Sequence, residues 1–511
     1  MRVISAPFPH YSYRSSDPMI LISPTARSLG IFSPYVPVSV PMGLGYVAGY
    51  LETKGEPIVL YDEEVENTPF DEGRLERMIA SEKAAPPYVF GFSCVTAGQA
   101  RAEEMARMIR RKYPDSLIVM GGIHPTLVPN DPFENSPTDV VVLGQGEQTM
   151  WEVLKTFRSQ GKNFDGVEGI VYSDDGRVVT GPPRKNYLSL NDMPDFPYHF
   201  FDEYIEKYDL GWVVSSYGCP FDCVFCSQRA ITGVRVSYSE NDKVIRQIKL
   251  LSEKYNVKHI WFADDNLSIK KKRILSLCDD IVNAGLHKKV SFDAQTRADG
   301  VTPEVLAAMK RANFRTISYG IEVATDRLMT MIKKGETVEE CKKAILMSKE
   351  AGLDVAGTFI FGWPTETDEE RRACFDLACE LDIEVARFNN ATPYPGTELY
   401  DWVKDEPGFN PGKRWKNMNT VGALVSHPFK KPMPFSYVPA TISERKLRKV
   451  ILRYNFLYSL RPKNIIRILK NGVNLGGHFT LPEKWYLSPK ETFVFLRFCF
   501  YTLGSFIRSF I

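Results

Sequence analysis

Short apolar runs alternate with helical stretches over residues 239–401, and this alternation is what most constrains the fold. Four runs have strand character and lead into polar residues: HIWFADDNLS (259–268), KVSFDAQTRAD (289–299), TISYGIEVATD (316–326) and DVAGTFIFGWPTET (354–367). Five helical stretches lie around them, at 239–255, 270–285, 302–313, 337–352 and 368–382. Such alternation predicts a parallel sheet, and barrels of this kind carry their chemistry at the carboxyl ends of the strands. Asp265, Gln295, Glu322 and the loop at 362–367 fall at those ends.

A second alternation occupies the N-terminal third of the chain. Helical stretches at 37–55 and 99–112 alternate with apolar runs at 57–62, 88–98, 116–126 and 139–149. This pattern predicts a doubly wound α/β domain. Glycines at its strand ends allow a backbone to approach a ligand closely. The candidate ligand contacts at these ends are Ser93, Gly121, Gly122, His124, Gly144, Gly146 and Glu147.

Length and composition limit the class of protein. A chain of 511 residues predicts two or three domains. We expect the divisions to be residues 1–165, a linker over 166–205 that opens with a hairpin, residues 206–430 and residues 431–511. A net charge of only +2 gives no nucleic-acid signature. Nine cysteines that do not resemble a disulfide framework, and an N-terminus without the apolar core of a secretory signal, favour a cytoplasmic protein.

Three cysteines stand close together in SSYGCPFDCVFCSQ (215–228), namely Cys219, Cys223 and Cys226. A structural zinc site needs four ligands, usually in two separated pairs, and a disulfide would leave one thiol over. A [4Fe–4S] cluster also normally takes four cysteines, so three would leave one iron open to a substrate or cofactor. An open-iron cluster is the favoured interpretation, and zinc or inert thiols remain as alternatives.

This CxxxCxxC loop, with Phe225 before its last cysteine, resembles the cluster loop of the radical S-adenosylmethionine superfamily. The resemblance implies that the three cysteines hold a [4Fe–4S] cluster whose open iron chelates S-adenosylmethionine, which one electron cleaves to a 5′-deoxyadenosyl radical. It implies S-adenosylmethionine contacts at Phe225, mostly through its backbone near the adenine, and at Gln295, Glu322 and Gly362. The stretch NNATPYPGTELYD (389–401) is similar to the last barrel strand and loop of the superfamily.

GGIHPT (121–126), followed by VVVLGQGEQT (140–149), resembles the cobalamin-binding domain of the B12-dependent class. The implied fold is an N-terminal Rossmann-like cobalamin domain, a partial (β/α)6 TIM-type barrel and a helical C-terminal extension. A DxHxxG motif is absent, so no lower cobalt ligand is assigned, and His124 is expected near the corrin or its nucleotide. A degenerate domain without cobalamin is the alternative. Methylthiotransferases are set aside because Cys94 alone precedes the barrel.

The C-terminal residues 441–511 carry thirteen Lys and Arg against three Glu. Their last part, 490–511, is nearly all apolar, but a transmembrane helix needs about 20 uninterrupted apolar residues. We therefore expect a helix lying in the interface of an anionic membrane, with a helix packed on the barrel as the alternative. On a helical wheel one narrow stripe is formed by Arg497, Tyr501, Gly504, Ser505 and Arg508.

Taken together, these resemblances imply an enzyme that transfers a methyl group from methylcobalamin to an unactivated carbon of a lipid-like or tetrapyrrole substrate. A radical oxidoreductase or cyclase without methyl transfer is the alternative, and a non-enzymatic iron–sulfur or zinc protein is the second. The expected partners are a small-molecule or lipid substrate and an electron donor such as flavodoxin or ferredoxin. No nucleic acid is expected, and residues 441–511 would contact the inner face of the membrane.

Overall fold

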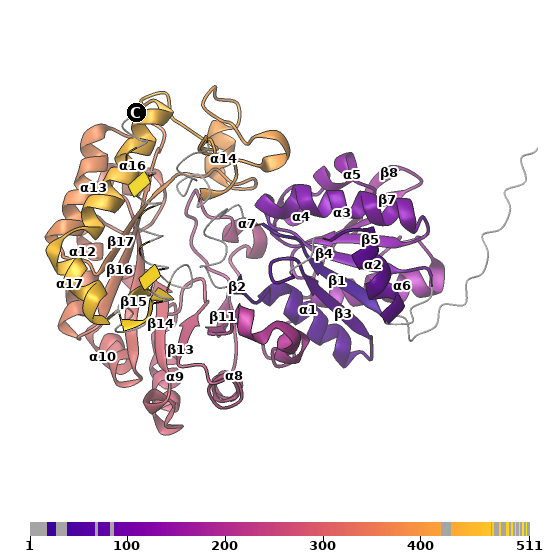
Figure 1. Cartoon of the computed structure of the whole chain (residues 1–511), viewed down its shortest axis with the longest axis horizontal. Coiled ribbons are helices and arrows are strands. Elements are labelled where there is room, and N and C mark those ends of the chain that lie inside the picture. The colour runs from indigo at the N-terminus through magenta and orange to yellow at the C-terminus, as the bar shows by residue number, and fades with distance from the viewer. Residues whose placement is uncertain are drawn as a thin grey trace, which may run out of the picture. The chain divides into compact units, whose positions relative to one another are not determined.

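The computed structural model describes residues 18–26, 38–66, 70–81, 86–420 and 431–471, with short stretches and single positions from 473 to 507. The chain divides into two compact units (Figure 1). The first consists of Met1–Thr25, Pro41–Tyr187 and Phe196–Phe200, and the second of Ala26–Val40, Leu188–Asp195 and Phe201–Ile511. Each unit is described by itself.

A seven-stranded sheet forms the first unit, in the order β3-β1-β4-β5-β6-β7-β8. Its parallel strands are β1 (Met19–Ser23), β3 (Ile58–Asp62), β4 (Val89–Ser93), β5 (Leu117–Gly121) and β6 (Val140–Val142). Its helices are α1 (Met42–Thr53), α2 (Glu72–Ser81), α3 (Gln99–Lys112), α4 (Ile123–Leu127), α5 (Asp131–Asn135) and α6 (Glu147–Gln160). This strand order matches the flavodoxin-like class of doubly wound sheets.

Alternate residues of these strands enter two separate cores. In β1, Met19 and Leu21 pack with residues of α1 and α6, whereas Ile20 and Ile22 pack with residues of α2 and α3. Because successive side chains of a strand point to opposite faces, helices cover the sheet on both sides. The doubly wound α/β fold predicted for the N-terminal third is confirmed.

The hairpin predicted at the start of the linker is formed by β7 (Ile170–Asp174) and β8 (Arg177–Thr180). Its two-residue turn, Asp175-Gly176, has positive φ angles of 47° and 84°, which suits an Asp-Gly pair. Strand β7 pairs antiparallel with β6, so the hairpin completes one edge of the first sheet.

Six parallel strands in chain order form the main sheet of the second unit. They are β10 (Trp212–Val213), β13 (His259–Phe262), β14 (Ser291–Thr296), β15 (Phe314–Glu322), β16 (Asp354–Phe361) and β17 (Val385–Asn390). The helices between them include α8 (Asn241–Glu253), α9 (Lys271–Asn283), α10 (Pro303–Arg311), α11 (Asp326–Met331), α12 (Val338–Glu350) and α13 (Asp368–Glu380). Within the described residues β10 and β17 do not pair, so the barrel is open. The predicted partial (β/α)6 architecture is confirmed.

Smaller elements flank this sheet. Strand β11 (Ser216–Tyr217) pairs with β12 (Ser237–Tyr238), and β2 (Val38–Ser39) pairs with β9 (Tyr208–Asp209). Short helix α7 (Gln228–Thr232) lies between β11 and β12 in the chain, and short helix α14 (Glu398–Val403) follows β17.

The helical C-terminal extension is confirmed where it is described, as α16 (Glu444–Ser459) and α17 (Pro462–Asn471). Helix α16 packs along the edge strand β17 (Figure 1). Asn455 donates a hydrogen bond from Nδ2 to the Phe388 carbonyl (2.8 Å) and accepts one from the Phe388 N–H (3.1 Å). The side chain thus takes the place that a neighbouring strand would have.

Most of the apolar end of the chain, including Arg497, Tyr501, Ser505 and Arg508 of the predicted stripe, lies outside the described residues. Among the helices that are described, none is both long and apolar enough to cross a membrane.

Candidate functional site

The cysteine loop, residues 218–227, runs from β11 to α7. Its first residue, Gly218, has a φ of +98°, and a Cβ there would lie 2.1 Å from the Arg235 carbonyl oxygen. The Gly218 N–H donates a 2.7 Å hydrogen bond to Asp265, which follows β13. Only glycine fits this turn, and the turn fixes the position of the next residue, Cys219.

Backbone hydrogen bonds connect the middle of the loop to two other segments of the second unit. The N–H of buried Val224 donates to the Ile332 carbonyl (3.1 Å), and the Val224 carbonyl accepts from the Leu399 N–H (2.8 Å). Cys219 and Cys223 are partly buried, while Cys226 is exposed. Hydrogen bonds to the protein therefore fix the backbone of the loop, while its thiols stay accessible to a ligand.

Burial raises the pKa of the Cys219 and Cys223 thiols. The charges of Lys334 and Arg297 oppose this rise at Cys219 and Cys223, so the surroundings contain cations that favour thiolates. In the described part of the chain, no group of three His, Cys, Asp or Glu side chains is arranged to hold a single metal ion.

Arg297 and Lys334 belong to a buried charge network beside the cysteine loop. The Arg297 guanidinium lies 3.6 Å from the centre of the Phe221 ring, and its Nη1 donates to the Lys334 carbonyl (2.7 Å). The Lys334 ammonium lies 3.8 Å from Glu322 and 3.7 Å from Glu336. Two cations and two carboxylates thus meet where β14 and β15 end.

Glu322 ends β15 at a bulge and has a φ of +65°. Its carboxyl is buried, and its Oε2 accepts no hydrogen bond. Burial raises the pKa of Glu322 to about 7. A buried acceptor without a donor is rare in proteins, so this oxygen is suited to the amino or hydroxyl group of a ligand.

The remaining expected S-adenosylmethionine contacts lie around the same strand ends. Gln295, on β14, is exposed, and its Nε2 lies 3.5 Å from the Asp265 carbonyl. Gly362 follows β16 with a φ of +89°, and its N–H donates to Glu366 (2.7 Å). The Phe225 ring packs edge-to-face on Trp363, the residue after Gly362, at 5.5 Å. The cysteine loop and the loop after β16 are therefore in contact.

Sequence reasoning missed Arg297, Lys334 and Glu336. They stand in TRAD (296–299) and KKGE (333–336), where charged residues look like ordinary loop surface. Their burial depends on the contact between these two loops, which no local sequence pattern shows. Asp264, beside Asp265, is fully buried and accepts hydrogen bonds from the N–H and hydroxyl of Ser215 (both 2.7 Å), so its role is to hold the strand before the cysteine loop.

In the first unit, strands β4, β5 and β6 are neighbours, so their carboxyl ends form one edge. Ser93 ends β4, and Gly121 ends β5. A Cβ on Gly122, whose φ is +97°, would lie 2.7 Å from the Cys94 carbonyl oxygen. Gly144 has a φ of +66° with open space where a Cβ would be. At the glycine positions no side chain covers this edge.

Gly146 precedes α6, and Glu147 begins it. The Glu147 carboxyl is buried, its Oε2 accepts no hydrogen bond, and burial raises its pKa to about 7. His124 differs, because it is fully buried within α4. Its Nδ1 lies 3.4 Å from the Thr96 hydroxyl and its Nε2 lies 3.1 Å from Asp131. Both ring nitrogens thus face protein groups.

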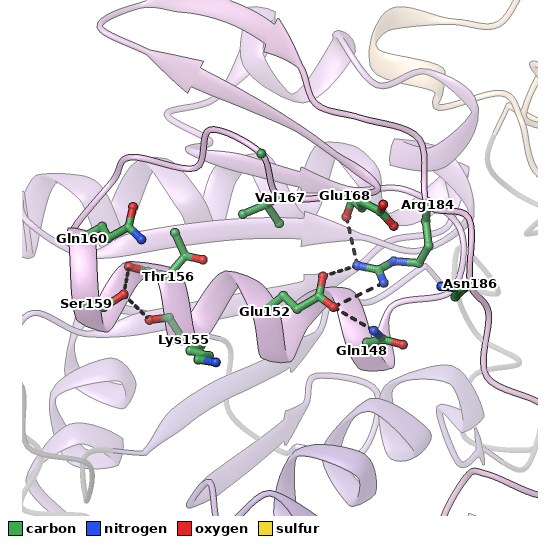
Figure 2. Close-up of a pocket in the computed structure, with 11 residues that line it drawn as sticks. Gln148, Glu152, Lys155, Thr156, Ser159, Gln160, Val167, Glu168, Arg184 and Asn186 are labelled. Atoms are coloured by element: carbon green, nitrogen blue, oxygen red, sulfur yellow. Dashed lines mark hydrogen bonds and ion pairs between the residues drawn. The ribbon is translucent and has the colours of Figure 1, made fainter.

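The first unit also contains a cavity of about 360 Å³ between α6 and the segments at 166–168 and 184–186 (Figure 2). Buried Arg184 donates to Thr149 (2.7 Å) and to the Glu168 carbonyl (3.1 Å), and it forms an ion pair with Glu152. Protein groups therefore satisfy the Arg184 guanidinium. None of the expected cofactor contacts lines this cavity.

Family models match both units of the chain. The radical SAM superfamily model matches residues 213–378, and the B12 binding domain model matches residues 32–154. These ranges contain the cysteine loop with its charge network and the glycine-rich edge of the first sheet.

Known proteins agree with these matches. The chain is 32% identical over 367 residues to the uncharacterized methyltransferase PH0819 of Pyrococcus horikoshii, which covers 71% of this chain and 78% of that protein. It is 27% identical to the anaerobic magnesium-protoporphyrin IX monomethyl ester cyclase of Rubrivivax gelatinosus, over 72% of this chain and 66% of that one. Its fold resembles the radical S-adenosylmethionine methyltransferase TsrM of Kitasatospora setae, with a TM-score of 0.64, 18% identity and coverage of 91% and 83%.

An enzyme of this type uses a [4Fe–4S] cluster, S-adenosylmethionine and cobalamin as cofactors. The similarity to PH0819 extends over most of both chains, and it favours methyl transfer over cyclisation. The chain therefore belongs to the cobalamin-dependent radical S-adenosylmethionine enzymes.

Proposed function

We propose that this enzyme methylates an unactivated carbon of a lipid-like or tetrapyrrole substrate, with Cys219, Cys223 and Cys226 as the ligands of its cluster. The observation that carries this proposal is the meeting of the cysteine loop with buried Arg297, Lys334 and Glu322 at the strand ends. Three thiols from one loop leave room for a further ligand on the cluster.

When bound, the cluster and S-adenosylmethionine supply a carbon radical that removes a hydrogen atom from the substrate, and cobalamin supplies the methyl group. The protein's own task is to hold these groups in register and to exclude water and oxygen. Arg297 and Lys334 favour the thiolate forms of Cys219 and Cys223. The free Oε2 of Glu322 is suited to orient S-adenosylmethionine through a hydrogen bond.

The other S-adenosylmethionine contacts in this proposal are Phe225, Gln295 and Gly362. Contact between Phe225 and Trp363 supports a common site for the cysteine loop and the loop after β16. The amide of Gln295 is exposed at the same edge of the sheet and can reach a ligand there.

For cobalamin, the proposed contacts lie at the carboxyl ends of β4, β5 and β6. They are Ser93, Gly121, Gly122, Gly144, Gly146 and Glu147. The free Oε2 of Glu147 can accept a hydrogen bond from an amide. Two apolar side chains at this edge, Val95 and Ile123, are 42% and 41% exposed, which suits contact with a macrocycle. His124 is left out because protein groups engage both its nitrogens.

The substrate class rests on two observations. One relative is a cyclase that is named for a magnesium-protoporphyrin ester, which supports a tetrapyrrole. The C-terminal region supports a lipid, because large apolar residues at a spacing of three and four are exposed there: Phe493, Leu496, Phe500, Leu503 and Ile507. With the basic residues of 441–511, this face favours peripheral contact with an anionic membrane from the cytoplasmic side. A flavodoxin or ferredoxin would supply the electron.

A cyclisation or oxidation without methyl transfer is the second candidate, and the similarity to the Rubrivivax cyclase favours it. Both candidates need the cluster and S-adenosylmethionine. They differ in whether a methyl group reaches the product.

The first experiment compares the parent protein with the Cys219/Cys223/Cys226→Ala variant after anaerobic reconstitution with iron, sulfide and hydroxocobalamin. Absorbance spectra report cluster and corrin, and dithionite assays with S-adenosylmethionine report 5′-deoxyadenosine. Cys379→Ala is a matched control, because this partly exposed thiol lies on α13.

We expect corrin in all three proteins, and cluster absorbance with 5′-deoxyadenosine only in the parent and the control. Cluster and 5′-deoxyadenosine without corrin in the parent would refute methyl transfer. Cluster absorbance that survives in the triple variant would refute the assignment of the ligands.

A further inference from the structure

The loop after β16, which contains Gly362, is fixed by buried side chains. Glu366 is fully buried, and its Oε2 accepts hydrogen bonds from the Gly362 N–H (2.7 Å) and from Nη1 of Arg371 (2.8 Å). Trp363 is also fully buried, and its indole N–H donates to the Ile360 carbonyl (2.8 Å). Hydrogen bonds to a buried charged group are strong, so these contacts hold Gly362 at its φ of +89°.

The C-terminal extension packs against this loop from outside the barrel sequence. A Cβ on Gly362 would lie 3.1 Å from Leu447 Cδ2 and 3.8 Å from Pro439 Cδ, and both of these residues are buried. The Thr441 hydroxyl donates to the Glu366 carbonyl (3.2 Å). The turn that leads into α16 and the first turn of that helix therefore contact the loop.

This contacting segment, residues 439–447, is named the α16 entry, and it is anchored on both sides. Before it, the Val438 N–H donates to the Gly408 carbonyl (3.0 Å). After it, Nη2 of Arg448 donates to the Met433 carbonyl (2.7 Å). Because its flanks are tied to other parts of the second unit, the α16 entry can serve as a fixed support for the loop.

Contacts continue from the α16 entry to the cysteine loop. Leu447 lies behind Gly362, and the next residue, Trp363, packs on Phe225 at 5.5 Å. Phe225 directly precedes Cys226. Since protein interiors are close-packed, a side chain lost at Leu447 changes the packing of the residues in front of it.

We propose that the α16 entry positions the loop after β16 for S-adenosylmethionine, with Leu447 as the positioning residue behind Gly362 and Thr441 as a second support. This proposal rests on the proposed function, since Gly362 and Phe225 are contacts proposed there. The α16 entry lies beyond the matches to both family models, which end at residues 378 and 154, so this support belongs to the C-terminal extension. A binding loop that shifts by about 1 Å loses much of its effect, which gives such a support its value.

The test measures S-adenosylmethionine binding to the anaerobically reconstituted holoenzyme by isothermal titration calorimetry, with the cluster oxidised so that no cleavage occurs. The variants are Leu447→Ala, the volume-conserving Leu447→Met and, as matched control, Ile451→Ala. Ile451 lies one turn further along α16 and is equally buried. Electron paramagnetic resonance of the reduced cluster, recorded as S-adenosylmethionine is added, is the second readout.

Leu447→Ala leaves a space behind Gly362, so we expect the Kd for S-adenosylmethionine to rise roughly tenfold. The change in the resonance signal should then require correspondingly more S-adenosylmethionine. Leu447→Met should bind within about twofold of the parent. Ile451→Ala should lower the midpoint of thermal unfolding as Leu447→Ala does and keep the Kd of the parent. Should Leu447→Ala fail to fold, Thr441→Val carries the test, with a Kd about threefold higher.

Two results overturn the proposal. Either the Leu447→Ala and Thr441→Val variants bind S-adenosylmethionine as the parent does, or Ile451→Ala weakens binding as much as Leu447→Ala, which makes the effect a general loss of packing. A parent that neither binds S-adenosylmethionine nor yields 5′-deoxyadenosine contradicts the proposed function itself. A parent that does both, beside variants of unchanged affinity, loses only the support from the α16 entry.

Discussion

At the scale of single residues, a buried carboxyl group marks the candidate site of each unit. Glu322 in the second unit and Glu147 in the first each have an oxygen without a hydrogen bond, and burial raises the pKa of each to about 7. Stability alone would favour an amide or an apolar side chain at such positions. Groups with perturbed pKa values gather at functional sites, which is consistent with a ligand supplying the missing donor.

In the protein without cobalamin, the loss of stability that comes from burying an ionisable carboxyl can be measured at Glu147. Its pKa lies near 4.5 in the unfolded chain and about 7 in the folded state. Stability is therefore highest below the unfolded value and falls as the pH rises to the folded value. Glu147→Gln removes this loss, so the variant should gain up to about 3 kcal/mol over the parent at about pH 8 and little at about pH 4.5.

Thermal unfolding of the two proteins across this pH range measures the difference. Glu134→Gln, at an exposed position of α5, is the matched control and should follow the parent at every pH. A constant difference between Glu147→Gln and the parent, independent of pH, would contradict the burial of an ionisable carboxyl.

Some candidate site residues could be proposed from the sequence and others could not, for a physical reason. The three cysteines share one loop, and Glu322 and Gly362 stand where an apolar run turns polar, so a local pattern was enough to propose them as site residues. Lys334 follows a short helix, and its burial depends on loops that come from other strands. His124 shows the converse, because its sequence context suggested an open loop, and the fold encloses it.

At the scale of elements, the helices and strands followed from hydrophobic periodicity, but the partner of α16 did not. An amphipathic basic helix fits a membrane surface or a protein surface equally well in sequence. The structure shows α16 on the edge strand β17. Its Tyr458 hydroxyl shares its proton between the carbonyls of Ala378 in α13 (3.1 Å) and Ile383 before β17 (2.5 Å). The domain boundaries drawn at 165, 205 and 430 stay predictions.

The Asn455 side chain offers a direct test of this edge. Asn455→Ala leaves the N–H and carbonyl of Phe388 without their partner, so we expect a loss of about 2 kcal/mol in the free energy of unfolding. Arg453→Ala, at an exposed position of the same helix, should change stability little. Urea unfolding of the three proteins measures the effect, and equal midpoints for Asn455→Ala and the parent would refute this account of the edge.

At the scale of the whole molecule, the strand ends and the C-terminal region have different kinds of surface. Strand ends carry glycines, thiols and buried charge, whereas the C-terminal region combines basic residues with exposed apolar ones. A soluble enzyme gains nothing from a row of exposed Phe and Leu side chains, since covering each of them in an apolar phase is worth about 2 kcal/mol. An interfacial position would bring the enzyme to a substrate dissolved in lipid.

Co-sedimentation with vesicles tests this position. We expect the parent to bind vesicles that contain anionic phosphatidylglycerol and to bind purely zwitterionic vesicles at least about tenfold more weakly, because basic residues contribute about 1 kcal/mol each near an anionic surface. Leu496→Glu/Phe500→Glu removes two apolar contacts and should weaken binding roughly a hundredfold or more. Leu346→Glu, at a 50% exposed leucine of α12, is the control, because that helix lies on the barrel. Equal binding of the double variant and the parent would show that this apolar face has another partner, and the lipid-like substrate would lose its structural support.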